Sequence, residues 1–128
     1  MKRILIVDDV PGWIRFHQNN IEYLKIPDIE IDTASCAKDG LSEIMKSISK
    51  PYDVIFTDLQ MESDFLPKYA GEWFIEQIKT FKQYENSKIV IISATPSIKR
   101  IAEKYGVQCI SKTLIRNSDA IIYKNFIM

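Results

Sequence analysis

Reactive side chains follow four apolar segments of this sequence. Asp8 and Asp9 come directly after the first segment, and Asp58, Ser93 and Lys112 each follow another. Crowded carboxylates repel one another unless a cation lies between them, and oxygen ligands without His or Cys favour Mg²⁺ over zinc. An aspartate can act as a nucleophile, while a hydroxyl and a lysine can bind a phosphoryl group. The set predicts magnesium-dependent phosphoryl transfer, provided that the fold brings it together.

The elements that must position these residues begin with five short apolar runs. Runs rich in Ile and Val with little polar alternation are typical of parallel strands covered on both faces. The second run alternates apolar and polar residues, which predicts an edge strand with one wet face. The five predicted strands are Ile4 to Val7, Ile29 to Thr33, Val54 to Thr57, Ile89 to Ile92 and Val107 to Ile110.

Segments with a helical spacing of apolar residues follow the strands, at residues 11–24, 41–48, 74–81, 98–105 and 119–127. Pro11 suits the first turn of the first of these helices. Gly106 suits the end of the fourth. Asn117 or Ser118 is expected to cap the start of the last.

The strand–helix unit therefore occurs five times, which predicts an α/β fold. We expect a doubly wound, parallel five-stranded sheet with helices on both faces. The order 2-1-3-4-5 is the natural choice for five units, and it places a ligand site at the carboxyl ends of the strands. In this order strands 1, 3, 4 and 5 are neighbours, so the reactive side chains line one rim of the sheet.

Size and composition narrow the classes of protein. The 128 residues suit a single domain, and 46% hydrophobic and 27% charged residues indicate a globular chain. Basic and acidic residues balance at 17 each, which gives no support for nucleic-acid or membrane binding. No apolar run approaches the roughly 20 residues of a membrane span. Cys36 and Cys109 show no metal-ligand spacing. Two cysteines are also too few for a small secreted domain held together by disulfides, so we expect a cytoplasmic protein.

Over essentially its whole length the chain resembles the receiver domain of two-component response regulators. The resemblance rests on four segments: Ile4 to Asp9, Asp53 to Met61, Ile91 to Ala94, and Ser111 with Lys112. It implies a flavodoxin-like fold, with residues 1–128 as one receiver domain and no output domain in this chain. A receiver is not an enzyme beyond catalysing its own phosphorylation and dephosphorylation.

The resemblance also assigns a metal site and a phosphoacceptor. It implies that Asp58 accepts the phosphoryl group and also binds one Mg²⁺ ion. Asp8 and Asp9 would hold the same ion, directly or through water. The main-chain carbonyl of Gln60 would complete the protein ligands.

The remaining implied roles concern the phosphoryl group and the partners. Ser93 and Lys112 would bind the phosphoryl group, and the side chains of Gln60 and Thr95 occupy positions that tune its lifetime. The phosphoryl donor would be a histidine kinase or a histidine phosphotransfer protein. A downstream protein would bind the switched surface, and a dimer could form through residues 98–127.

Three departures from the family pattern stand out. Thr113 replaces the usual proline after Lys112, and a cis peptide bond before a non-proline residue costs about 2.5–4 kcal/mol. We therefore expect either a trans bond with a different loop or a strained site. Cys109 occupies the position of the usual switch aromatic. The segment Glu62 to Ala70 is longer than usual and delays the family's glycine to Gly71, so we expect a functional or mobile loop beside the site.

Other functions remain open at this point. Cys109 and Thr113 motivate a pseudo-receiver, which would keep the fold and act only as a protein-interaction module. An aspartyl-phosphate phosphatase needs an acid two residues after its nucleophile, where this chain has Gln60 after Asp58 and Val10 after Asp8. A dinucleotide-binding fold is disfavoured because no glycine-rich turn follows the first strand.

Overall fold

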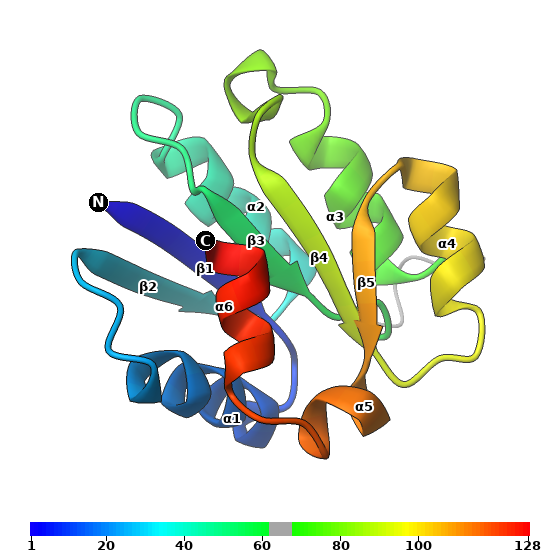
Figure 1. The fold of residues 1–128 in the computed structure, drawn as a ribbon. Coiled ribbons are helices and arrows are strands. Elements are labelled where there is room, and N and C mark those ends of the chain that lie inside the picture. The colour runs from blue at the N-terminus through cyan, green and yellow to red at the C-terminus, as the bar shows by residue number, and fades with distance from the viewer. Residues whose placement is uncertain (62–67) are drawn as a thin grey trace.

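The computed structural model describes residues 1–61 and 68–128. Its strands form a parallel sheet in the order β2-β1-β3-β4-β5 (Figure 1), which confirms the predicted topology. The strands are β1 (Lys2–Val7), β2 (Ile29–Ala34), β3 (Val54–Thr57), β4 (Lys88–Ser93) and β5 (Gln108–Ser111). The edge position predicted for the second strand is also confirmed, since β2 pairs along β1 and ends the sheet on that side.

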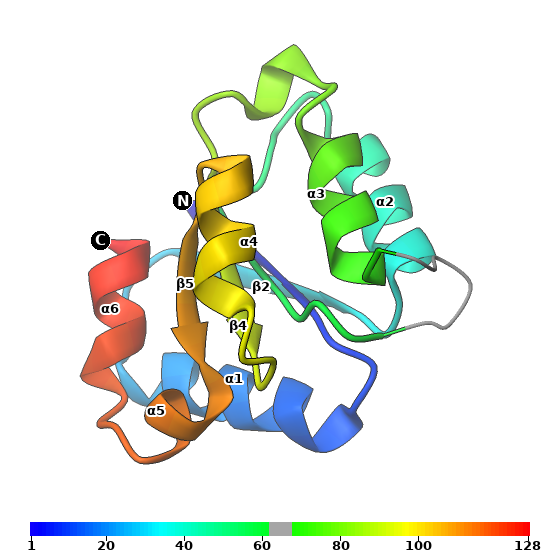
Figure 2. The same cartoon turned by 90° about the vertical axis from the view of Figure 1, so that its right-hand side faces the viewer.

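Helices cover both faces of the sheet (Figure 2). One face holds α2 (Ala37–Lys46), α3 (Ala70–Ile78) and α4 (Ile98–Tyr105), while the other holds α1 (Pro11–Tyr23), α5 (Lys112–Arg116) and α6 (Ile121–Ile127). A short 3₁₀ helix, Lys82–Tyr84, precedes β4. Across the two described stretches, none of the helices has the length and hydrophobicity that crossing a bilayer requires.

Strand side chains alternate between two apolar clusters, one on each face of the sheet. Leu5 and Ile55 pack in the cluster beneath α2, α3 and α4. Ile6 and Phe56 pack in the cluster beneath α1 and α6. Because successive side chains of a strand point to opposite faces, the uninterrupted apolar runs of β1 and β3 fill both clusters at once.

Two of the predicted helix boundaries follow from backbone geometry. Pro11 is the first residue of α1, where its missing N–H costs nothing. Gly106 ends α4 in the left-handed conformation with φ 66°, which residues with a Cβ rarely adopt.

The C-terminal region differs from the prediction. The short helix α5 is not among the predicted helices, and α6 begins at Ile121 without a side-chain cap. Asn117 and Ser118 instead donate hydrogen bonds backward, to the main-chain oxygens of Thr113 (3.0 Å) and Leu114 (2.6 Å). The predicted cap is therefore wrong, because these side chains close α5 rather than open α6.

Candidate functional site

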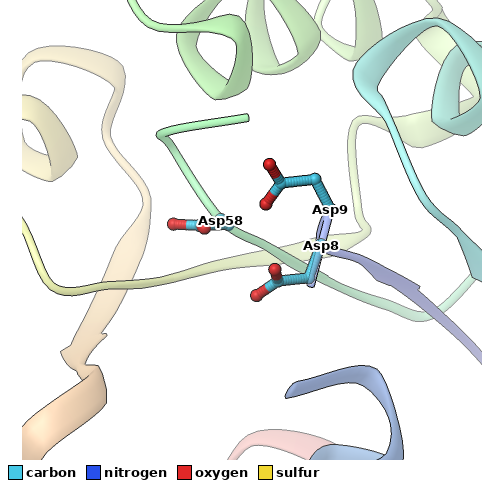
Figure 3. Close-up of side chains that lie close together, drawn as sticks. All are labelled: Asp8, Asp9 and Asp58. Atoms are coloured by element: carbon cyan, nitrogen blue, oxygen red, sulfur yellow. The ribbon is translucent and has the colours of Figure 1, made fainter. Parts of the chain in front are cut away.

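The carboxyl ends of β1 and β3 bring three carboxylates together. β1 and β3 pair in parallel with Val7 opposite Thr57, so the residues that follow, Asp8 and Asp58, lie side by side. The N–H of Asp58 donates to the carbonyl of Val7 at 3.0 Å. Carboxylate oxygens of Asp8, Asp9 and Asp58 all lie within 4.8 Å of one another (Figure 3).

Burial and local hydrogen bonds fix two of these carboxylates. The side chains of Asp8 and Asp58 are buried, whereas that of Asp9 is exposed. The Oδ1 atom of Asp8 accepts a hydrogen bond from the N–H of Val10 at 2.9 Å. The Oδ1 atom of Asp58 accepts from the N–H of Leu59 at 2.7 Å. One oxygen of each buried carboxylate is thus bound to the main chain, and the other faces the interior of the cluster.

Lys112 reaches this cluster from the end of β5, the strand at the opposite edge of the sheet from β2. Its Nζ lies 3.0 Å from Oδ2 of Asp8 and 3.0 Å from Oδ2 of Asp58. Burial on its own would lower the pKa of Lys112, but the attraction of Asp58 and Asp8 outweighs it and raises the pKa. Lys112 is therefore charged at neutral pH and bridges the two buried carboxylates.

Negative charge remains in excess in the Asp–Lys cluster, defined here as Asp8, Asp9, Asp58 and Lys112. It contains three carboxylates and a single ammonium group. The pKa of Asp8 is raised, first by burial and then by repulsion from Asp58, although Val10 and Lys112 oppose the rise. Converging carboxylate oxygens with uncompensated negative charge are a suitable donor set for a hard divalent cation.

The predicted phosphoryl-binding hydroxyl lies on the same rim. Ser93 ends β4, opposite Ser111 of β5, and its side chain is fully buried. Its Oγ accepts a hydrogen bond from the N–H of Thr95 at 3.3 Å. The hydroxyl of Thr95 lies 3.4 Å from that of Tyr69, which directly precedes α3. The β4–α4 connection is therefore in contact with the start of α3.

The other predicted site residues occupy different environments. Gln60 is exposed, two residues beyond Asp58. Cys109 lies in β5 opposite Ile91, half-buried against the cluster beneath α2, α3 and α4. Thr113 is the second residue of α5, so a helix rather than an extended loop follows Lys112. Of the predicted loop Glu62 to Ala70, residues 62–67 lie outside the described part.

A glycine fixes the approach of α3 to the site. A Cβ on Gly71 would overlap the carbonyl oxygen of Asp58 and lie 2.6 Å from the Cα of Leu59. The N–H of Gly71 donates to the carbonyl of Leu59 at 3.0 Å. Only glycine allows α3 to pack this closely, so the delayed glycine in the sequence meets the main chain of Asp58.

Sequence reasoning missed one neighbour of Lys112. Trp13 is half-buried and packs in the cluster beneath α1 and α6. Its ring also lies 4.9 Å from Nζ of Lys112. Its place in the first turn of α1, just after the acidic pair, is a signal that could have placed it at the site.

The fold and the Asp–Lys cluster together define a receiver-type signalling domain. The model of the response regulator receiver domain matches residues 4–120, and the chain belongs to this family. Comparison with curated proteins found no match.

Solved structures support the same assignment of the fold. A CheY-like receiver domain from Methanospirillum hungatei JF-1 is 17% identical, with a TM-score of 0.71 over 98% of this chain and 89% of that one. A receiver domain from Clostridium thermocellum is 25% identical, with a TM-score of 0.64 over 100% of both chains. A CheY-like receiver from Methylobacillus flagellatus is 18% identical, with a TM-score of 0.70 over 98% of both.

Proposed function

We propose that this receiver domain is phosphorylated on Asp58 in a magnesium-dependent transfer from a histidine kinase or histidine phosphotransfer protein. The observation that supports this most strongly is the charge excess of the Asp–Lys cluster. Two buried carboxylates share one ammonium group, with a third carboxylate beside them. Such crowding is costly in a purely structural role, whereas a phosphoryl-transfer site requires it for a divalent cation.

The donor set fits one Mg²⁺ ion. Carboxylate oxygens of Asp8, Asp9 and Asp58 converge within 4.8 Å, and the main-chain carbonyl of Gln60 would add a fourth protein ligand. When bound, the ion would neutralise charge on the phosphoryl oxygens and on the attacking carboxylate.

Each residue of the site then has its own role in the transfer. A carboxylate oxygen of Asp58 attacks phosphorus, and an O–P bond forms as the P–N bond to the donor histidine breaks. The bonding electron pair leaves with the imidazole nitrogen. Lys112, already 3.0 Å from Asp58, supplies positive charge to the phosphoryl oxygens, and the hydroxyl of Ser93 donates a hydrogen bond to them. Gln60 and Thr95 would set how readily water reaches the acyl phosphate.

Beryllofluoride, a phosphoryl mimic that binds a carboxylate together with Mg²⁺, tests this proposal. Titration monitored by tryptophan fluorescence should show binding to the wild type only when Mg²⁺ is present. Asp58→Asn should not bind the mimic, while the exposed control Asp39→Asn should bind as the wild type does. Equal responses of the two variants would contradict the assignment of Asp58.

The pseudo-receiver remains the second candidate. It is favoured by the absence of a switch aromatic at position 109, where Cys109 is only half-buried. Such a protein would bind partners without phosphorylation and would show no specific affinity for millimolar Mg²⁺. A folded wild type that fails to bind both Mg²⁺ and beryllofluoride would favour this function.

A further inference from the structure

The side chain of Lys112 lies between acidic groups and an aromatic ring. Its Nζ contacts Asp8 and Asp58 at 3.0 Å and lies 4.9 Å from the ring centroid of Trp13. A lysine ammonium within about 6 Å of a tryptophan centroid is attracted to the ring face, and the attraction strengthens when the pair is shielded from water. Lys112 is buried and Trp13 is half-buried, so the pair is partly shielded from water.

We propose that Trp13 is a positioning residue for Lys112 in phosphoryl transfer. The inference rests on the proposed function, because it assumes that Lys112 contacts the phosphoryl group. It assigns to the indole a task beyond packing: to hold a flexible ammonium group toward the acceptor carboxylate.

The main chain at Lys112 is fixed by a helix rather than by a proline. Lys112 is the first residue of α5, and the hydroxyl of Ser111 caps this helix by accepting from the N–H of Leu114 at 3.1 Å. The cap orients the Cα of Lys112 but leaves the four methylene groups of its side chain free to rotate. The constraints near Nζ therefore come from the carboxylates of Asp8 and Asp58 and from the ring of Trp13.

The ring can support Lys112 in both states of the site, whereas the carboxylates cannot. Once a cation and a phosphoryl group enter the cluster, they compete for the oxygens of Asp8 and Asp58 that Lys112 now contacts. The face of an indole does not bind Mg²⁺ or accept a phosphoryl group. The contact with Trp13 therefore persists while the partners of Lys112 exchange.

Trp13 is itself held in place. Its ring packs edge-on against Phe16, with centroids 5.3 Å apart, and lies 5.5 Å from the ring of His17. The guanidinium of Arg116 lies 5.3 Å from the same ring. A ring packed on α1 and facing a residue of α5 can orient Lys112 with little freedom of its own.

A double-mutant cycle tests the positioning role, with the rate of phosphorylation by acetyl phosphate at saturating Mg²⁺ as readout. Trp13→Leu, which keeps apolar bulk without a ring, should lower the rate about threefold to tenfold. Trp13→Phe should restore part of the loss. Trp73→Leu makes the same substitution at another half-buried tryptophan, on α3, and should change the rate by less than about twofold.

The decisive comparison uses a Lys112→Ala background. There, Trp13→Leu should have no further effect, because the group that the ring positions is gone. An equal loss in both backgrounds, or no loss in the wild-type background, would overturn the positioning role alone. A wild type that takes up no phosphoryl group would overturn the proposed function, and the positioning role with it.

Discussion

Two groups of charged side chains in this protein have similar composition and opposite character. The Asp–Lys cluster lies at the carboxyl ends of β1, β3 and β5. The second group, called the Glu72 cluster, joins α3 to α4 through Glu72, Glu76 and Tyr105. Both combine acidic groups with lysines, but only in the Asp–Lys cluster do the carboxylates outnumber the ammonium groups.

Local donors satisfy the Glu72 cluster. The carboxylate of Glu72 accepts from the N–H of Tyr69 at 3.2 Å and lies 3.1 Å from the hydroxyl of Tyr105. Glu76 accepts from Lys68 at 2.9 Å and lies 2.9 Å from the same hydroxyl. Each of these carboxylates also pairs with a lysine of its own, Glu76 with Lys68 and Glu72 with Lys104 at 3.7 Å, whereas Asp8 and Asp58 share Lys112.

The pKa values shift in opposite directions in the two clusters. The hydrogen bond from Lys68 lowers the pKa of Glu76, so its charged form is favoured. Burial and the neighbouring Asp58 raise the pKa of Asp8, so its charged form is disfavoured. The two clusters thus differ in the balance of their charges rather than in the presence of acidic residues, and we expect this balance to separate a metal-binding site from a structural cluster.

The largest expected effect is on metal binding. Loss of an outer-shell partner typically costs about tenfold to a hundredfold in metal affinity, so removal of a direct ligand should cost more. Asp8→Asn should therefore weaken Mg²⁺ binding by about a hundredfold or more. Calorimetric titration with Mg²⁺ measures the change, and Glu76→Gln is the matched control with unchanged affinity. Equal losses of Mg²⁺ affinity in Asp8→Asn and Glu76→Gln would contradict the assignment of metal binding to the Asp–Lys cluster.

A second prediction concerns pH and His17, a buried group that belongs to neither cluster. Burial, with a smaller contribution from Lys112, lowers the pKa of His17 from 6.5 to about 4. Between pH 6.5 and about pH 4, His17 is protonated in the unfolded chain but not in the folded protein. The free energy of unfolding therefore falls as the pH drops through this range. The loss between pH 7 and pH 4 should reach about 3 kcal/mol.

Urea unfolding across that pH range checks the prediction against His17→Gln. The imidazole lies 2.6 Å from the hydroxyl of Tyr123, and glutamine keeps hydrogen-bonding capacity without titrating. The variant should lack about 3 kcal/mol of the wild-type pH dependence. Parallel curves for both proteins would show that His17 does not titrate as described.

The third prediction tests the structural role of the Glu72 cluster. Glu72→Ala removes a buried acceptor, so the N–H of Tyr69 loses this hydrogen bond and Tyr105 keeps only its bond to Glu76 of the two. Stability should fall by about 2 kcal/mol. Mg²⁺ affinity should stay within twofold of the wild type, and a large loss of affinity would contradict the separation of the two clusters.

The smallest effect is expected for Tyr105→Phe. This change removes one hydroxyl shared by Glu72 and Glu76 while keeping the ring. The free energy of unfolding should fall by about 1 kcal/mol. Thermal unfolding at pH 7 measures it, with the exposed Tyr23→Phe as a control that should be neutral. A destabilisation as large as that of Glu72→Ala would show that the hydroxyl of Tyr105, rather than the carboxylate of Glu72, stabilises the Glu72 cluster.

Much of this architecture could be predicted from the sequence because its signals are local. Uninterrupted apolar runs mark strands buried on both faces, and Pro11 and Gly106 mark two helix boundaries. Once the strand order is assumed, the residues that follow β1, β3, β4 and β5 must share one rim. The grouping of Asp8 with Asp58 follows from that topology without any knowledge of side-chain contacts.

The features that escaped prediction depend on tertiary contacts. The five-residue helix α5 is too short for an apolar period, so nothing marked it in the sequence. The contact of Trp13 with Lys112 joins the first and last thirds of the chain. Glu72 resembles any acidic residue in the first turn of a helix until α4 brings Tyr105 against it.

The most direct test of phosphorylation on Asp58 is the intact mass of the protein after incubation with acetyl phosphate. The wild type should gain the mass of one phosphoryl group with Mg²⁺ and none with EDTA. Asp58→Asn should gain none in either condition, although it remains folded. An unmodified wild type with Mg²⁺, or a phosphorylated Asp58→Asn, would contradict the assignment of the Asp–Lys cluster as a phosphoacceptor site.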